Sequence, residues 1–163
     1  VLARLGEETL REQVLAGGYR LLDWRQGGPD VDERYMVHIA ASGAMLPEAC
    51  AAAAYLWREG VAANVLNLTS PRQLFAQWRA TPYAQRARLF DWLIPAAERH
   101  APIITVQDGS AHSLAWLGSA LGTNLIPLGI DDFGQSGTSA DLYRHFHIDW
   151  ESIAAAAFAA LNG

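Results

Sequence analysis

Residues 127–149 read PLGIDDFGQSGTSADLYRHFHID, and this stretch decides the fold class of the chain. The apolar run that leads into it, 125–128, is typical of the end of a buried strand, and Gly129 with the acidic and glycine-rich residues after it breaks that strand. Thr138 stands three residues before Asp141, an acidic variant of the capping box that predicts the start of a helix. A strand, a loop and a capped helix in this order are typical of an α/β fold.

The same alternation of strand and helix signals runs through the rest of the chain. Apolar, β-prone runs predict strands at 19–24, 35–41, 61–68, 103–107 and 124–128. Helical spacing, caps and glycine stops predict helices at 7–15, 47–59, 71–99 with breaks at Pro82 and Pro95, 111–121, 139–146 and 150–161. Strand 103–107 is apolar without alternation, as expected when helices cover both faces of a sheet. We therefore expect an α/β protein, a three-layer α/β/α sandwich with a mostly parallel sheet.

The composition limits the classes of function. At 163 residues the chain is long enough for one domain with a real core, which we expect to span 1–163. A net charge of −5 argues against nucleic acid as a partner, which needs a cationic face, and no apolar run approaches the roughly 20 residues of a membrane span. The lone Cys50 has no disulfide partner and no secretion leader is seen, so we expect a cytoplasmic location. All 12 basic residues are Arg, which excludes a lysine Schiff base. The first residue, Val1, suggests a fragment of a longer polypeptide.

Polar residues follow the predicted strands at their carboxyl ends, where open parallel sheets bind ligands. They are Ser42, Thr69, Ser70, Asp108, Ser110, His112, Asp131 and Asp132. An Asp and a His at neighbouring strand ends are able to carry out acid–base chemistry. We favour a structural interpretation of these residues. In it Ser42, Ser70 and Ser110 cap helices, and Ser70 forms a capping box with Gln73. Asp108 and Asp131 both bond loop amides.

Three further motifs are weak signals of function. Gly134-Gln135-Ser136-Gly137 lacks the residue between serine and second glycine that a hydrolase nucleophile elbow requires. His145 and His147 face opposite sides of a helix, which disfavours a shared metal ion and makes a helix C-terminal role for His145 the better interpretation. Ser42-Gly43-Ala44 offers one glycine where a dinucleotide-binding turn needs three.

Four segments, taken in order, resemble the C-terminal domain of the transketolase family: 36–49, 64–70, 101–109 and 127–149. That family includes transketolases and the decarboxylating component of pyruvate dehydrogenase. The Thr69-Ser70 strand ending and the tail at 149–161 resemble most the homodimeric pyruvate dehydrogenase branch. The resemblance implies a five-stranded sheet with one antiparallel strand, 19–24, beside 61–68.

The resemblance also implies a cofactor that lies outside this chain. Enzymes of the family use thiamine diphosphate, held through magnesium by a Gly-Asp-Gly motif and an Asn downstream. Here Gln107-Asp108-Gly109 is the only similar sequence, and the glutamate that activates the cofactor belongs to the family's middle domain. We therefore assign no catalytic, cofactor-binding or metal-binding residue to this chain, and expect thiamine diphosphate and magnesium in the parent enzyme.

The favoured hypothesis is a non-catalytic C-terminal domain of a pyruvate dehydrogenase-like, thiamine diphosphate-dependent 2-oxoacid decarboxylating component. Its expected partners are the missing N-terminal and middle domains, the second subunit of a homodimer and a lipoyl acyltransferase core. Two alternatives remain open: the C-terminal domain of a transketolase that transfers ketol units between sugar phosphates, and a free-standing small-molecule-binding or regulatory domain. The chain has six tryptophans: Trp24, Trp57, Trp78, Trp92, Trp116 and Trp150. We expect most of them in the core and the others on surfaces that missing domains cover.

Overall fold

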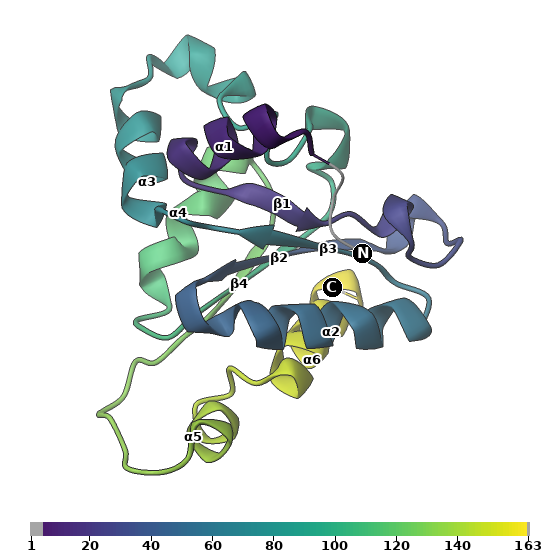
Figure 1. Cartoon of the computed structure of the whole chain (residues 1–163), viewed down its shortest axis with the longest axis vertical. Helices are drawn as coiled ribbons and strands as arrows, with labels where there is room; N and C mark the ends of the chain where they lie inside the picture. Colours follow the sequence, from purple (N-terminus) through teal and green to yellow (C-terminus); the bar gives the residue numbers. More distant parts are fainter. Residues whose placement is uncertain (1–4, 163) are drawn as a thin grey trace.

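A five-stranded sheet lies at the centre of the computed structural model, which describes residues 5–162 (Figure 1). The strands are β1 (Tyr19–Leu22), β2 (Met36–Ser42), β3 (Ala62–Asn67), β4 (Ile103–Gln107) and β5 (Leu125–Leu128), in the spatial order β1-β3-β2-β4-β5. The pairs β2–β3, β2–β4 and β4–β5 are parallel, and β1 is antiparallel to β3. The predicted five-stranded sheet with one antiparallel strand is thereby confirmed.

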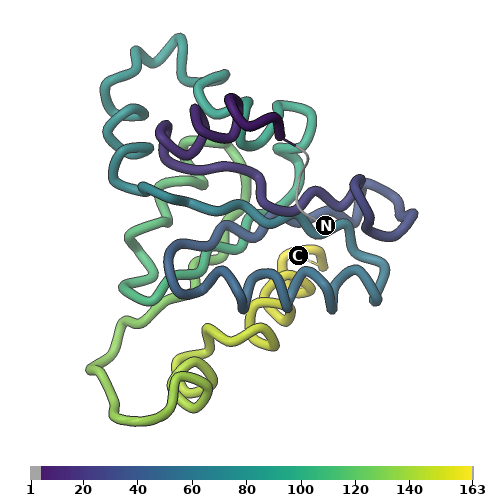
Figure 2. The backbone as a smooth tube through the Cα atoms, viewed as in Figure 1, coloured from purple at the N-terminus to yellow at the C-terminus, as the bar shows by residue number. Residues whose placement is uncertain are grey.

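Helices cover both faces of the sheet. They are α1 (Glu7–Ala16), α2 (Leu46–Arg58), α3 (Pro71–Ala80), α4 (His112–Leu121), α5 (Ser139–His145) and α6 (Trp150–Asn162). One face packs against α2 and α6, and the other against α3 and α4. The chain then leaves the sheet after β5 in a long exposed loop and returns through α5 to α6, as the tube in Figure 2 shows. These layers confirm the predicted α/β/α sandwich.

Strand β2 shows how the sequence builds the two faces of the core. Val37, Ile39 and Ala41 belong to the cluster with α2 and α6, whereas Ala40 belongs to the cluster with α3 and α4. All four side chains are buried. A strand with both faces buried needs no polar alternation, which is why these strands read as apolar runs.

The ends of two predicted segments have local causes. Strand β1 ends before Asp23, because this carboxylate accepts a hydrogen bond from Arg25 N at 3.1 Å and begins a 3-10 turn, Trp24–Gln26. The segment 71–99 is broken as predicted: α3 is followed by 3-10 helices at Tyr83–Arg88 and Ala96–Glu98, each directly after a proline.

The capping box predicted at Ser70 and Gln73 is wrong, because Gln73 donates its side-chain hydrogen bond to the neighbouring helix α1 instead. Ser70 makes no side-chain capping bond, and Gln73 Nε2 donates to Leu15 O at 2.7 Å. Thr69 Oγ1 donates to Val14 O and Gln77 Nε2 donates to Ala16 O, each at 2.8 Å, and both carbonyls belong to the last turn of α1. The last carbonyls of a helix have no partner within it, so α3 and the turn before it satisfy them.

The tryptophans are less buried than expected. Only Trp24 is buried, while the other five are half-buried with one side against a core cluster: Trp57, Trp78, Trp92, Trp116 and Trp150. Cys50 is also half-buried, and burial raises the pKa of its thiol. Among residues 5–162 the longest α-helices have 13 residues, and none is long and apolar enough to cross a bilayer.

Candidate functional site

The carboxyl edge of the sheet brings three of the predicted residues together. Ser110 Oγ lies 2.7 Å from His112 Nδ1 and 2.5 Å from Asp131 Oδ1. The first two residues follow β4 and the third follows β5, and these strands are parallel neighbours. Asp131 Oδ1 also accepts a hydrogen bond from Ala111 N at 3.0 Å, which confirms that this carboxylate bonds a loop amide.

The order of these groups differs from that of a catalytic triad. In a Ser-His-Asp triad the imidazole lies between the hydroxyl and the carboxylate, so that it accepts the serine proton. Here the hydroxyl lies in the middle and gives its single proton to Asp131, so His112 Nδ1 donates to Ser110 Oγ. The imidazole therefore cannot accept the hydroxyl proton through this contact, and the arrangement does not activate the serine.

The electrostatics of the cluster support the same interpretation. The hydrogen bond from the Ser110 hydroxyl lowers the pKa of the Asp131 carboxyl, and the Ala111 amide and the charge of His112 act in the same direction against some desolvation. A carboxylate with a lowered pKa is a weak general base near neutral pH. The cluster thus serves to fasten the loop after β5 to the start of α4.

Other residues at this edge do not join the cluster. Ser42 Oγ donates to Leu68 O at 3.3 Å and makes no side-chain capping bond to the 3-10 helix Gly43–Met45 that follows it, and Ser110 directs its hydroxyl to Asp131 instead of capping α4. Both capping predictions are therefore wrong. Asp108 is exposed and makes no hydrogen bond within the described residues, so its predicted bond to a loop amide is also wrong. Asp132 is likewise exposed.

The motifs that looked weak in the sequence are also apart from this cluster. Ser136 lies in the exposed loop between β5 and α5, eight residues after the end of the strand, so it does not stand on a sharp strand-to-helix turn. His145 is the last residue of α5, as predicted, with its ring against Phe146 at 4.8 Å between centroids. His147 follows with a left-handed backbone, φ 55°. Within residues 5–162, no group of three His, Cys, Asp or Glu side chains could hold a metal ion.

A pocket of about 410 Å³ opens beside the cluster, between the first turns of α3 and α4. Its lining consists of Pro71, Arg72, Phe75, His112, Ser113 and Trp116. The rings of Phe75 and Trp116 meet at 5.3 Å between centroids, so the floor is mainly aromatic. The Arg72 guanidinium makes no hydrogen bond or ion pair within the described residues and is exposed at the rim.

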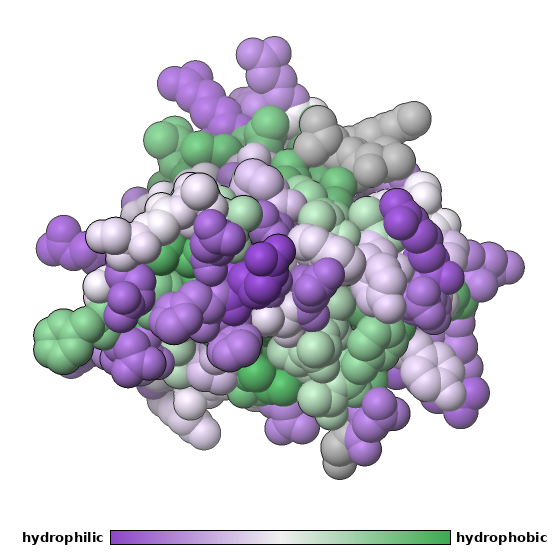
Figure 3. Space-filling model, turned by 90° about the horizontal axis from the view of Figure 1, so that it is seen from below, coloured by the Kyte–Doolittle hydropathy of each residue, from purple (hydrophilic) through white to green (hydrophobic). Residues whose placement is uncertain are grey.

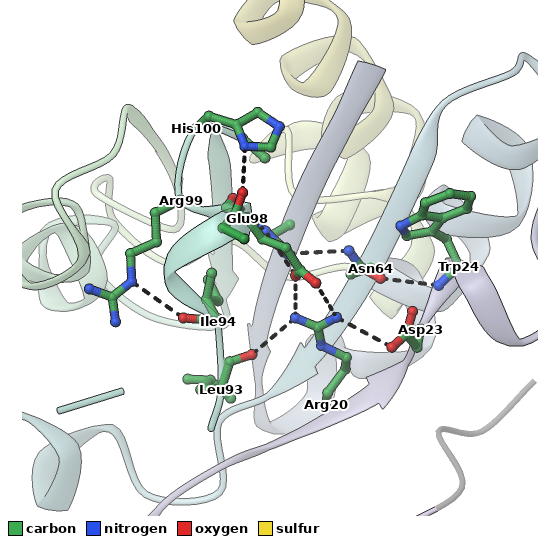
Figure 4. Close-up of polar contacts among 12 residues, drawn as sticks. Arg20, Asp23, Trp24, Asn64, Leu93, Ile94, Glu98, Arg99 and His100 are labelled. Carbon is green, nitrogen blue, oxygen red and sulfur yellow. Dashed lines mark hydrogen bonds and ion pairs between the residues drawn. The ribbon is translucent and has the colours of Figure 1, made fainter. Parts of the chain in front are cut away.

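A second polar cluster lies at the opposite, amino end of the strands (Figure 4). Arg20 on β1 donates through both terminal nitrogens to the Glu98 carboxylate and, at 3.3 Å, to Leu93 O. His38 on β2 has Nε2 at 3.3 Å from Glu98 O and Nδ1 at 3.4 Å from the Asn64 amide nitrogen. The four side chains of this cluster are buried, and we call it the amino-end network: Arg20, His38, Asn64 and Glu98.

The amino-end network keeps fixed protonation states at neutral pH. Burial, and then the charge of Arg20, lowers the pKa of His38 to about 4. Burial alone would raise the pKa of Glu98, but the hydrogen bonds and charges of Arg20, His38 and Arg25 outweigh it and lower that pKa. The ion pair is therefore charged and the histidine neutral.

The network has a structural role, since its polar groups are paired and it lies away from the edge where parallel sheets bind ligands. It ties β1, β2 and β3 to the turn before β4. Sequence reasoning missed it because Glu98 is 78 residues from Arg20. The available signal was His38 and Asn64, two polar residues inside otherwise apolar strand segments.

The face formed by α2 and α6 carries an apolar strip between hydrophilic borders (Figure 3). A shallow hollow of about 300 Å³ lies on α6 and is walled by Tyr55, Trp150 and Phe158. Tyr55 contacts both other rings, at 5.4 and 6.5 Å between centroids. The hollow offers packing surface, with Glu151 as its only charged lining residue.

Comparison with known proteins identifies relatives of the chain. A family model for the transketolase-like TK C-terminal domain matches residues 17–149. The protein described as "Transketolase, plasmid" from Cupriavidus necator is 33% identical over 147 residues, which cover 90% of this chain and 19% of that protein. The chain thus spans about a fifth of the length of this curated relative.

Solved structures share the fold. A transketolase mutant from Pichia stipitis in complex with xylulose 5-phosphate and the transketolase from Leishmania mexicana each match with a TM-score of 0.63 and 21% identity, over 93% of this chain and 19% of theirs. A split-gene transketolase, described as an inactive β4 tetramer, matches with a TM-score of 0.55 and 21% identity, over 78% of this chain and 39% of its own.

Proposed function

Because the chain belongs to the family of transketolase-like C-terminal domains, we propose that it is the non-catalytic C-terminal domain of a transketolase. The parent enzyme would transfer ketol units between sugar phosphates with thiamine diphosphate and a divalent metal. The observation that carries this proposal is the 33% identity to a transketolase over 90% of the chain. These relatives favour the transketolase hypothesis over the pyruvate dehydrogenase-like one that we preferred from the sequence.

The described residues do not fit a site for thiamine diphosphate and its metal. Asp108, in the sequence most similar to the family's metal-binding motif, is exposed and stands without a second ligand. Asp131 is already engaged by Ser110 and Ala111. We therefore place the cofactor in other parts of the parent polypeptide and derive no chemical step from this chain.

The role that remains for the chain is support of assembly. Several large apolar side chains are exposed on different sides of the molecule, and contact with further domains would remove them from water: Val14, Leu15, Tyr35, Tyr83 and Phe133. The split-gene relative is described as both tetrameric and inactive, which supports association without activity in this part of the family. We thus propose that 1–163 is one domain whose partners are the remaining domains and a second subunit.

Two assays of the full-length parent enzyme test the reaction. With xylulose 5-phosphate as donor and an aldose phosphate as acceptor, we expect ketol transfer that depends on thiamine diphosphate. With pyruvate we expect no decarboxylation. The opposite result would replace the transketolase proposal with the 2-oxoacid decarboxylase.

Calorimetry on the 163-residue chain tests the assignment of roles. We expect no heat of binding with thiamine diphosphate and magnesium at concentrations at which the full-length parent binds. Micromolar binding by the chain alone would show that the cofactor site lies in it, and would argue for a free-standing binding module.

A further inference from the structure

The pocket between α3 and α4 has a floor of aromatic rings that solvent still reaches. Phe75 and Trp116 are both half-buried, and the ring of Trp78 stacks on that of Trp116 at 5.6 Å between centroids. Because α3 and α4 lie side by side, the floor is continuous from one helix to the other (Figure 1). The pocket measures about 410 Å³, toward the lower end of the roughly 300–1,000 Å³ range of ligand clefts, and has room for one aromatic ring with a short substituent.

One guanidinium at the rim of this pocket has no partner. Arg72 is exposed and makes no hydrogen bond or ion pair within the described residues. Two other arginines on this side of the sheet are engaged by the protein itself. Arg86 donates to Thr81 O at 2.9 Å, and Arg99 donates to the Asp91 carboxylate at 2.8 Å. The N–H donors of Arg72, beside an aromatic floor, are thus available to a ligand.

The polar wall of the pocket comes from α4 and is held in a fixed position. His112 and Ser113 both line the pocket, and the Ser113 hydroxyl makes no hydrogen bond within residues 5–162. His112 Nδ1 is bonded to Ser110 Oγ, which in turn bonds Asp131. A wall that is already oriented loses less conformational entropy when a ligand binds. The cluster at the carboxyl edge therefore supports the pocket as well as the loop after β5.

The charge of the pocket limits the class of ligand. None of its described lining residues is acidic, and Arg72 carries a permanent positive charge. A carboxylate brings one negative charge and fits a planar guanidinium with two parallel hydrogen bonds. A phosphate monoester brings nearly two charges at neutral pH, and the second would be repelled by Asp131, which lies beyond His112. An aromatic carboxylate fits both the floor and the rim.

We propose that this pocket binds a small aromatic carboxylate from solution. Its ring lies against Phe75 and Trp116, edge to face or offset, and its carboxylate accepts hydrogen bonds from Arg72 and from the Ser113 hydroxyl. A ligand of about ten non-hydrogen atoms should bind with a dissociation constant on the order of 100 µM. The site is separate from the proposed ketol transfer, for which this chain supplies no chemical step.

The hollow on α6 provides a comparison within the same molecule. It is also walled by aromatic rings, but its charged lining residue is Glu151. Like charges repel, so an aromatic carboxylate should avoid this hollow although it offers a similar apolar surface. Specific binding should therefore occur on the α3–α4 face of the sheet and not on the α2–α6 face.

Calorimetric titration of the 163-residue chain with three probes separates the ring from the charge. Phenylacetate carries both, phenylacetamide has the same ring and shape without the charge, and acetate has the charge without the ring. We expect phenylacetate to bind, phenylacetamide to bind about fivefold more weakly, and acetate not to bind measurably. Arg72→Ala should weaken phenylacetate to the level of phenylacetamide and leave phenylacetamide unchanged.

Matched variants locate the contact. Arg79→Ala removes the same charge from an exposed position on the same helix, outside the pocket, and should leave both affinities unchanged. Phe75→Leu should weaken phenylacetate and phenylacetamide alike, whereas Phe158→Leu, in the hollow on α6, should weaken neither. Circular dichroism establishes that each variant is folded, and if Phe75→Leu is not, the two arginine variants decide.

Three results would overturn the proposal: no binding of phenylacetate at millimolar concentration, equal affinity for phenylacetate and phenylacetamide, or equal losses in Arg72→Ala and Arg79→Ala. Each of them leaves the proposed transketolase reaction untouched, because that reaction is measured on the full-length parent enzyme.

Discussion

Two polar clusters lie at opposite ends of the same sheet, and they differ in their relation to water. In the amino-end network Arg20 and Glu98 have side chains that are 10% and 8% exposed. At the carboxyl edge Ser110 and Asp131 form an equally short contact in an exposed setting. Burial makes each lost partner costly, whereas water replaces a lost partner at the surface. The comparison teaches that position in the fold, and not the number of hydrogen bonds, decides what a polar cluster contributes to stability.

The largest effect is expected from Glu98→Gln. Loss of the carboxylate charge leaves the buried Arg20 guanidinium with Asp23, at 3.4 Å, as its remaining ionic partner, which destabilises by about 3 kcal/mol. Denaturant unfolding followed by far-ultraviolet circular dichroism measures the change. The exposed pair of Asp32 and Arg34 provides the control, since Asp32→Asn should be indistinguishable from the unmodified chain. A loss for Glu98→Gln as small as that of the control would mean that the network is not desolvated.

A pH dependence of stability should come from His38. Its pKa is about 4 in the folded chain against 6.5 ordinarily, so the unfolded chain binds a proton that the folded chain does not between these values. Stability is therefore complete above pH 6.5 and falls by about 3 kcal/mol as the pH drops toward 4. Protonation of Glu98 in acid also lowers the stability of the folded chain, because the pKa of this carboxyl is lower in the folded chain than in the unfolded one.

The variant His38→Gln separates the histidine from the carboxylate. It should be less stable at neutral pH, yet its stability should decline less between pH 6.5 and 4 than that of the unmodified chain. Unfolding curves at four or five pH values measure both slopes. Equal slopes in the two proteins would show that His38 is protonated in the folded state near its ordinary pKa.

A moderate effect is expected where α3 satisfies the carbonyls of α1. Gln73→Ala and Gln77→Ala each remove one side-chain donor to the last turn of α1, and each should cost about 1 kcal/mol. Amide hydrogen exchange in α1 should then be faster in each variant than in the unmodified chain, and this increase should be larger in α1 than in β2. Gln85→Ala is the matched control, because Gln85 is exposed on the 3-10 helix Tyr83–Arg88; it should leave hydrogen exchange in α1 unaltered.

The smallest effect on stability is expected at the carboxyl edge. Ser110→Ala removes the hydroxyl that bonds Asp131, so the pKa of this carboxyl should rise toward its ordinary value while the unfolding midpoint barely moves. Carbon-detected NMR titration measures the pKa, and thermal unfolding measures the midpoint. A destabilisation comparable to that of Glu98→Gln would erase the distinction between the two clusters.

Much of the fold could be predicted from local sequence, as the helix at 139–146 shows. Thr138 Oγ1 accepts a hydrogen bond from Asp141 N, as the capping box indicated, because both partners lie within one turn. The box at Ser70 failed although its sequence is as good. Gln73 bonds Leu15 O, 58 residues away in the chain, and no local pattern contains that partner.

The candidate site follows the same division. Asp131 was expected to bond a loop amide, and it does so at Ala111. Ser110 lies between His112 and Asp131, in an order unlike that of a triad. This order depends on the close approach of two loops at Gly129. Residue types alone do not specify which group receives the hydroxyl proton.

The sequence by itself determined the layers of this protein, its strand and helix positions and its membership of a family, because these follow from apolar periodicity, caps and ordered motifs along the chain. Only the tertiary structure decided which polar groups are buried together and which remain in water. Desolvation, pKa and the choice of hydrogen-bond partner depend on distances between segments far apart in the chain, and those distances exist only once the sheet has formed.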